Sequence, residues 1–244
     1  MCGHENKVMM AWASPDGNRE PLKLSPPLVR SATLTQPYWK FPVKMLYCGS
    51  MNFLPIGFKE WAIVCEKLGS GDQSIILRKG GIAEGRDGFR FKHDAFFLFP
   101  TLFHEQIART TLPPETPLPQ LDPGQITLHL YAEVEWTEFL GDWEAARRLA
   151  PFHVWSEQSV AERFHYNETK DPDKPPGIHV AFLRIYRLAE PWSFPNEPKY
   201  GGCRSWLNLP ELPDGLAAEP VLSDEAHAAL VAEVRAVIGR GRAR

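Results

Sequence analysis

Cationic residues beside glycines are the first feature of this chain that could do chemistry. Between residues 78 and 92 there are five lysines or arginines against two carboxylates, although the 244-residue chain has a net charge of −3. Arg78 and Lys79 directly precede Gly80 and Gly81, which would let the backbone approach a ligand closely while both side chains reach it. Such a segment is typical of contacts with a phosphate or nucleic-acid backbone, and it is equally compatible with a solvated surface.

Aromatic residues alternate with the later cations of this segment. Phe89, Arg90, Phe91 and Lys92 form a pattern typical of a half-buried strand with its charged face in water. A tryptophan from the last third of the chain is a candidate for stacking on a base. The predicted phosphate-binding or nucleic-acid-binding residues are Arg78, Lys79, Arg90, Lys92, His93 and Trp206.

Four aromatic residues of the second half stand near predicted turns and strand ends: Trp155, Trp192, Tyr200 and Trp206. Around a cavity they could enclose a flipped or single-stranded base. Packing in the core is the alternative interpretation, because aromatic side chains bury more apolar area than other residues.

A second hypothesis is a small metal-dependent hydrolase or phosphate-ligand enzyme that uses Glu60, His93 or His104. A carboxylate and imidazoles can hold a metal ion or transfer protons. The simpler interpretation makes Glu60 a charge at the rim of a strand and both histidines structural. Walker, HExxH and GxSxG motifs are missing from the sequence, so we assign no catalytic residue, metal ligand or cofactor.

Strands and helices can be placed around these residues. A hairpin is predicted from an alternating run at 61–66, a glycine-bearing break at 69–73 and a β-branched run at 74–78. Further strands are predicted at 126–136, 178–188 and 203–207, with a turn segment at 191–202. Helices are predicted after the N-cap residues Asp142, Ser156 and Ser223, the last with Gly239 as its C-cap.

This order predicts a mixed α+β fold with a mainly antiparallel, curved or barrel-like sheet and flanking helices. A small barrel of the PUA-like type, which includes the base-reading EVE and ASCH modules, has a similar element order by analogy. Residues 1–50 are rich in proline and poor in periodicity, so we expect an extended or disordered segment there. Residues 51–240 are predicted to form one domain, with a proline-rich connector at 112–124.

Several blocks of the chain resemble a known bacterial family. The run EWAIVCEKLGSGDQSIILRKGGI, the run FKHDAFFLFPTLFHEQ and the later block YGGCRSW are similar to the domain-of-unknown-function family 1802. The family has no established activity, so the resemblance implies no catalytic residue. Some members are associated with Mrr-type restriction endonuclease domains, which implies a DNA-directed or defence-related role by association.

The composition of the chain indicates in which compartment the protein works and which partners it binds. The four cysteines are scattered without a CxxC pair, which indicates neither a zinc cluster nor a disulfide framework and favours a reducing cytoplasm. No apolar run approaches the ~18–20 residues of a membrane span, and the N-terminal sequence lacks a secretory pattern. The predicted partner is DNA or RNA, and no membrane contact is expected.

Overall fold

The computed structural model describes residues 51–79, 91–102, 106–166 and 175–239, so the predictions for residues 1–50, Arg90 and His104 lie outside the described residues. The strands are β1 (Ile56–Trp61), β2 (Ile75–Lys79), β3 (Ala95–Thr101), β4 (Gln125–Leu140), β5 (Ile178–Pro195), β6 (Trp206–Asn208) and β7 (Ala218–Pro220). The helices are α1 (Ala62–Ser70), α2 (Trp143–Arg147), α3 (Glu157–Phe164) and α5 (Asp224–Gly239), with 3-10 turns η1 (Ile107–Arg109), η2 (Ala150–Phe152) and η3 (Pro198–Tyr200).

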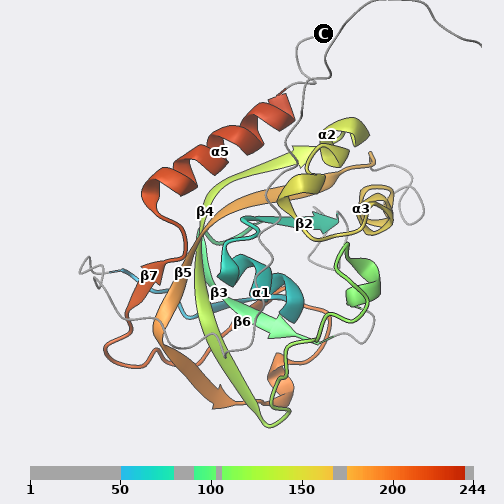
Figure 1. The fold of residues 1–244 in the computed structure, drawn as a ribbon. Coiled ribbons are helices and arrows are strands. Elements are labelled where there is room, and N and C mark those ends of the chain that lie inside the picture. The colour runs from blue at the N-terminus through green and yellow to red at the C-terminus, as the bar shows by residue number, and fades with distance from the viewer. Residues whose placement is uncertain (1–50, 80–90, 103–105, 167–174, 240–244) are drawn as a thin grey trace, which may run out of the picture. The chain divides into compact units, whose positions relative to one another are not determined.

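All seven strands belong to one sheet with the order β2-β5-β4-β3-β1-β6, and β7 pairs with β5 beside this path. Among the described strand pairs, β1–β3 is parallel and the other five are antiparallel. Figure 1 shows the long strands β4 and β5 bending side by side through the molecule, with α5 along one side. The predicted mixed α+β fold with a mainly antiparallel sheet and flanking helices is confirmed.

The sheet is strongly curved. The pairing of β4 with β5 shifts register between Leu128 and Leu130 and again between Val134 and Trp136, and such irregularities bend strands. In the order of the sheet, β2 lies at one end and β1 near the other. Even so, the Arg78 guanidinium of β2 donates to the Lys59 carbonyl of β1. The sheet therefore curls until its two ends approach each other, as predicted for a curved or barrel-like sheet.

The predicted hairpin is wrong, because residues 62–70 form helix α1 instead of a strand. A short apolar run cannot be assigned to a strand or a buried helix by periodicity alone. Four consecutive residues from Ala62 to Cys65 are buried, as expected for a helix that the curved sheet surrounds. The helix ends at Gly71, whose φ of 80° is the left-handed conformation that glycine adopts most easily. The second predicted strand is confirmed as β2.

The two long strands extend further than the sequence indicated. The predictions at 126–136 and 178–188 are confirmed, but β5 continues to Pro195, where a turn was expected from residue 191. Trp192 and Phe194 alternate with exposed neighbours and are buried, and this burial favours the extended strand over a turn. The predicted strand at 203–207 is shorter and begins only at Trp206.

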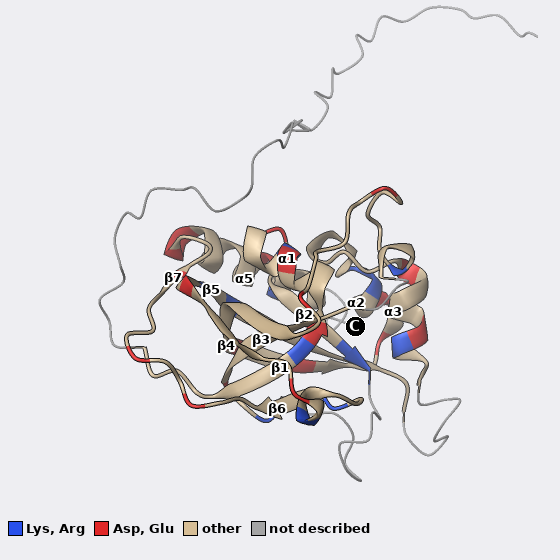
Figure 2. Ribbon diagram, turned by 90° about the horizontal axis from the view of Figure 1, so that it is seen from below, with Lys and Arg blue, Asp and Glu red and all other residues tan. Residues whose placement is uncertain are grey.

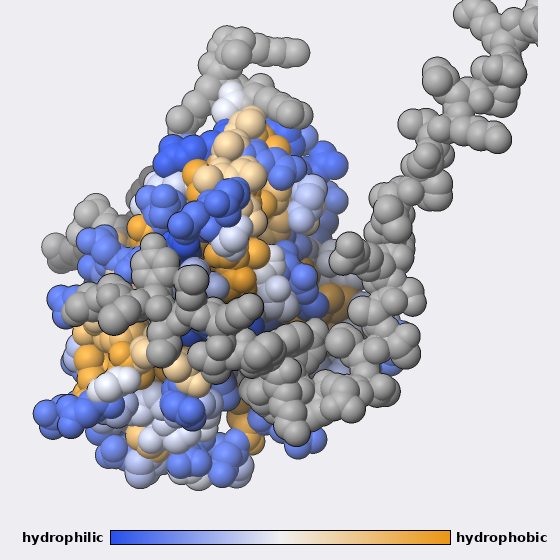
Figure 3. All heavy atoms as spheres, turned by 60° about the vertical axis from the view of Figure 1, so that its left-hand side comes forward, coloured by the Kyte–Doolittle hydropathy of each residue, from blue (hydrophilic) through white to orange (hydrophobic). Residues whose placement is uncertain are grey.

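The helix starts follow the predicted caps. The side chains of Asp142, Ser156 and Ser223 accept from backbone amides in the first turns of α2, α3 and α5. Helix α5 buries Val234 and Ile238 against the sheet, and Figure 3 shows hydrophobic residues bordered by hydrophilic ones on this side of the molecule. Gly239 is the last residue of α5 rather than a C-cap beyond it.

Two apolar clusters form the core. The larger one contains Phe58, Trp155 and Val234, and the second contains Phe53, Trp192 and Tyr200. Trp155, Trp192 and Tyr200 are thus core residues, as the packing interpretation predicted. Residues 112–124 contain no helix or strand, and the strands before and after them, β3 and β4, are neighbours in the sheet. In the part of the chain that the structure describes, no helix is long and apolar enough to cross a membrane.

Candidate functional site

The ring of Phe58 is the centre of the candidate site. Strands β1 and β6 place Phe58 opposite Trp206, and the two ring centroids are 4.6 Å apart. Phe96 of β3 lies 5.0 Å from the Phe58 ring, and the guanidinium carbon of Arg78 lies 4.4 Å from its centroid. We call Phe58, Arg78, Phe91, His93, Phe96 and Trp206 the Phe58 cluster.

Three of the predicted binding residues meet in this cluster. His93 packs edge-on against Trp206 at 4.9 Å, and Trp206 and Arg78 both contact Phe58. Lys79, the neighbour of Arg78, places its ammonium group 3.9 Å from the ring centroid of Tyr166. Lys92 is exposed and lies three residues before the start of β3 at Ala95. The structure thus brings together Arg78, His93 and Trp206, with Lys79 beside Arg78 on β2.

Glu60 is buried, not a charge at the rim. Its side chain is 2% exposed, its Oε1 atom accepts from the Trp61 amide at 2.8 Å, and its Oε2 atom lies 3.6 Å from Arg78 Nη2. The burial has a local cause, since β1 passes directly into α1 and Glu60 therefore lies at the N-terminus of that helix. The amide and the helix dipole favour a carboxylate there, and Arg78 supplies the opposite charge that a buried carboxylate needs.

Two donors of the Phe58 cluster have no acceptor. Arg78 Nε and Trp206 Nε1 are buried and have no hydrogen-bond partner among the described residues. Buried donors are almost always paired in native proteins, and leaving one unpaired costs about 1–3 kcal/mol. Because both donors contact the same Phe58 ring, a ligand that carries acceptor atoms could satisfy both of them.

Arg163 is a charged residue of this region that the sequence reasoning did not single out. Its guanidinium carbon lies 3.8 Å from the ring centroid of Trp155 and 5.7 Å from that of Trp61. Burial lowers the pKa of Arg163 to about 10, and the charge of Glu60 raises it while that of Arg78 lowers it further. No helical spacing could have linked the two residues, because Trp155 precedes the N-cap Ser156 and lies outside the helix that carries Arg163.

With this geometry established, the sequence can be compared with known families. Residues 57–233 match the model of a family described as "Domain of unknown function (DUF1802)". The chain belongs to this family. The match includes Lys59 of β1 and Arg78 of β2, which contact each other, and it extends over almost all of the described helices and strands, from β1 into α5. The earlier resemblance is therefore confirmed, while the association with Mrr-type domains stays a prediction.

Solved structures of one protein are similar to the DUF1802 chain. They are the ASCH protein of Zymomonas mobilis and a serine-to-alanine variant of it, each 13% identical to the chain. The match to the variant covers 73% of this chain and 94% of the variant, with a TM-score of 0.33. The match to the unmodified protein covers 72% of this chain and 93% of that protein, with a TM-score of 0.32. These similarities are too weak to bring a function to the DUF1802 chain. No functionally curated protein matches it.

Further basic groups of the DUF1802 chain surround the contact between β1 and β2. Lys59 Nζ donates to the Gly202 carbonyl at 2.9 Å, and burial lowers the pKa of Lys59, with the charge of Arg204 lowering it further. Figure 2 shows basic and acidic ribbon segments at the ends of β1 and β2 and on α3. Positive charge therefore extends from β2 across β1 to the segment before β6.

The hydrolase hypothesis finds no assembled site in the described residues. Glu60 is engaged by Arg78, His93 packs against Trp206, and His104 lies outside the described residues. Residues 51–79, 91–102, 106–166 and 175–239 hold no group of three or more His, Cys, Asp or Glu that could bind a metal ion. Burial, and then the Glu60 carboxylate, raise the pKa of the Cys65 thiol well above its usual value, which makes it a poor nucleophile.

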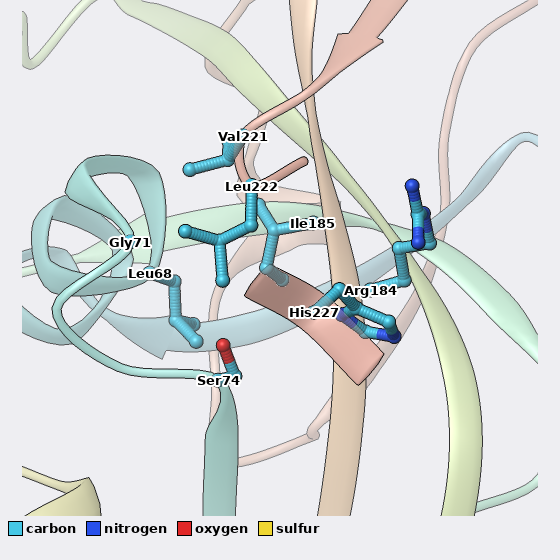
Figure 4. A pocket seen from close by; sticks show the side chains of 8 residues that line it. All are labelled: Leu68, Gly71, Ser74, Arg184, Ile185, Val221, Leu222 and His227. Carbon is cyan, nitrogen blue, oxygen red and sulfur yellow. The ribbon is translucent and has the colours of Figure 1, made fainter. Parts of the chain in front are cut away.

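A small cavity lies on the other side of α1, between that helix, β5 and α5. Figure 4 shows Leu68, Ile185 and Leu222 around it, with the side chains of Arg184 and His227 at one side. Its volume of ≈ 10 Å³ is room for about one water molecule. This cavity is therefore too small to be a substrate site.

Proposed function

We propose that this DUF1802 protein is a nucleic-acid-binding module whose binding surface includes the Phe58 cluster and Lys79. The observation that carries the proposal is the pair of buried, unpaired donors, Arg78 Nε and Trp206 Nε1, on the same aromatic ring. Phosphate oxygens and the carbonyl and ring-nitrogen acceptors of bases are the groups that such donors bind.

The cations divide into two groups by their contacts. Arg78 is held by Glu60 and by the Lys59 carbonyl, so it would act as a positioned donor with little freedom. Lys92 is exposed, and Lys79 lies on β2, on a different segment of the chain, so each would contact a separate phosphate as a point charge. Trp206 would donate to a base through its indole N–H. Arg90, outside the described residues, stays a predicted phosphate contact.

The experiment compares substitutions that spare the buried ion pair. Fluorescence anisotropy with labelled single-stranded RNA, single-stranded DNA and duplex DNA would be measured for Lys79→Ala, Lys92→Ala and Trp206→Phe. We expect each lysine change to weaken binding of all sequences alike, and Trp206→Phe, which keeps an aromatic ring but removes the N–H, to weaken it by about 1 kcal/mol or more.

Lys67→Ala is the matched control, because Lys67 pairs with Asp72 at the end of α1 and belongs to neither group. Unchanged affinity in all three test variants, with wild-type binding intact, would place the binding surface elsewhere. A role beside restriction endonucleases and a cytoplasmic location both stay predictions from the sequence.

A further inference from the structure

Arg163 is a half-buried cation without an ion-pair partner among the described residues. The nearby carboxylates are engaged elsewhere, since Glu162 pairs with Arg109 and Glu60 with Arg78. Arg163 lies over the Trp155 ring, and its one hydrogen bond, at 2.9 Å, goes to the Ser159 carbonyl of its own helix. A guanidinium removed from water without an ion-pair partner of its own is costly, and Glu60 is already paired with Arg78, so the arrangement favours a bound anion.

His153 contributes an unsatisfied donor near Arg163, since both residues contact Trp155. Its Nδ1 atom accepts from the Trp155 amide at 3.1 Å, which places the ring proton of the neutral imidazole on Nε2. His153 is 6% exposed and Nε2 has no hydrogen-bond partner. Burial, and then the positive charge of Arg163, lower the pKa of His153 to about 4, so the ring stays a neutral donor near pH 7.

The net charge of Arg78, Arg163 and Glu60 is +1, which one bound negative charge would neutralise. Arg78 and Arg163 carry two positive charges, and Glu60 supplies one negative charge between them. With His153 Nε2, Arg78 Nε is the second buried donor of this group that has no acceptor among the described residues. The donors come from β2, from α3 and from the segment before α3, so an anion with oxygens in several directions suits them better than a planar carboxylate.

We propose that Arg163, together with Arg78 and His153, binds a phosphate group, either free phosphate or the phosphodiester of a nucleic acid. This inference goes beyond the proposed function, because Arg163 and His153 are outside the Phe58 cluster and the site would exist for either source of the phosphate. Arginine is suited to this role, since its planar group can stack on Trp155 while its edge holds two phosphate oxygens.

The test measures how much phosphate raises the melting temperature of the full-length protein. Sodium phosphate would be compared with sodium chloride at equal ionic strength, for wild type, Arg163→Gln, Arg163→Lys and Arg147→Gln. Arg147 is the control, because it is an exposed arginine on α2 that pairs with Glu144 and Glu157. Each variant is compared with itself in chloride, so a change in basal stability does not affect the result.

We expect a phosphate-dependent rise in wild type and in Arg147→Gln, a loss of at least about tenfold in phosphate affinity in Arg163→Gln, and an intermediate loss in Arg163→Lys. A second arm repeats the comparison with a short single-stranded oligonucleotide. Loss in both arms identifies a phosphodiester as the ligand, and loss in the phosphate arm alone identifies free phosphate.

Two results would overturn the inference: no phosphate-dependent rise in wild type at millimolar phosphate, or an equal rise in Arg163→Gln. Neither result decides the proposed function, because Arg163 is outside the Phe58 cluster and that function is tested separately by oligonucleotide binding of the Lys79, Lys92 and Trp206 variants. Conversely, wild-type protein that binds phosphate through Arg163 and binds no oligonucleotide would sustain this inference and refute the proposed function.

Discussion

At the scale of single residues, a buried carboxylate and a largely buried guanidinium face each other between β1 and β2. The side chains of Glu60 and Arg78 are 2% and 17% exposed. Removing one partner of such a pair leaves the other charge uncompensated, and this usually costs about 3–5 kcal/mol. The pair therefore stabilises the curl of the sheet as well as positioning a donor for a ligand.

A double-mutant cycle tests the coupling of this pair. We expect Glu60→Gln and Arg78→Met each to lower the free energy of unfolding by about 3 kcal/mol, and the double variant to lose clearly less than the sum. Urea unfolding measures all four proteins. The matched cycle on the exposed pair Lys67–Asp72 should give a coupling of less than about 1 kcal/mol. Additive losses for Glu60 and Arg78 would show that the two charges do not act as a pair.

The second prediction for single residues concerns acid stability. Burial lowers the pKa of His153 to about 4 in the folded protein, below the 6.5 of the unfolded chain. Between these values the unfolded chain binds a proton that the folded protein does not, so stability rises with pH. This contribution is fully present above pH 6.5 and declines as the pH falls towards 4, by about 3 kcal/mol in total.

His153→Asn removes the titrating group and keeps an acceptor for the Trp155 amide. We expect the difference in unfolding free energy between pH 7 and pH 4.5, measured in urea, to be smaller in this variant than in wild type. His165→Asn, at an exposed histidine after α3, is the control and should keep the wild-type difference. Equal differences in wild type and His153→Asn would mean that His153 titrates normally in the folded protein.

At the scale of elements, helix α5 extends six residues past the end of the family match at 233 and closes one side of the sheet. Val234 is 0% exposed and neighbouring Glu233 is exposed. We expect Val234→Ala to lower the free energy of unfolding by about 1.5–3 kcal/mol, because two buried methyl groups are lost. Glu233→Ala should change it by less than about 0.5 kcal/mol, as measured in the same urea titrations. Similar values for both would mean that α5 does not pack on the core.

Elements with clear local signals were predictable, and those decided by tertiary packing were not. The caps at Asp142 and Ser156 and the alternation in β4 identified their elements. Helix α1 was predicted as a strand, because its first four residues are all apolar and buried and so show no period of 3.6. The same error led to the wrong expectation that Glu60 is a charge at the rim. Its carboxylate is buried because the chain turns from β1 directly into α1, which places Glu60 at a helix N-terminus.

The candidate site was predictable in part. Arg78, His93 and Trp206 were predicted from their types; the pairing of β1 with β6 brings Trp206 to Phe58, and the curl of the sheet brings Arg78 of β2 to the same ring. Their proximity could not be predicted, because it depends on the curl of the sheet and on a pairing between segments about 150 residues apart. Arg163 was missed because its partner Trp155 looked like a helix-entry residue, and its lack of a carboxylate partner is visible only in three dimensions.

At the scale of the whole molecule, the described domain needs the residues just before β1. Phe53 is buried and packs against Phe97 and Tyr131, with ring centroids 5.9 and 4.9 Å apart, and the Leu54 amide donates to the Tyr131 hydroxyl. Deleting a buried phenylalanine costs about 3–5 kcal/mol. The second core cluster therefore begins upstream of the first strand.

Two shortened chains test this arrangement together with the predicted N-terminal segment. A chain that starts at Met51 should melt within about 4 °C of the full-length protein. A chain that starts at Ile56 lacks Phe53, and its melting temperature should be lower by clearly more than about 4 °C. Calorimetry measures both. A large loss already at Met51 would show that residues 1–50 stabilise the domain, contrary to the expectation of an extended or disordered segment.

The most direct test of nucleic-acid binding is the dependence of wild-type affinity on salt. Each phosphate neutralised on a single strand changes the slope of log K against log salt concentration by about −0.7. With three contacts, from Arg78, Lys79 and Lys92, we predict that the protein binds single-stranded RNA or DNA at low salt with a slope of about −2. Lys79→Ala removes one contact, so its slope should be less steep by about 0.7. Absence of binding to any nucleic acid at low salt, or a slope near zero, would contradict the proposed function.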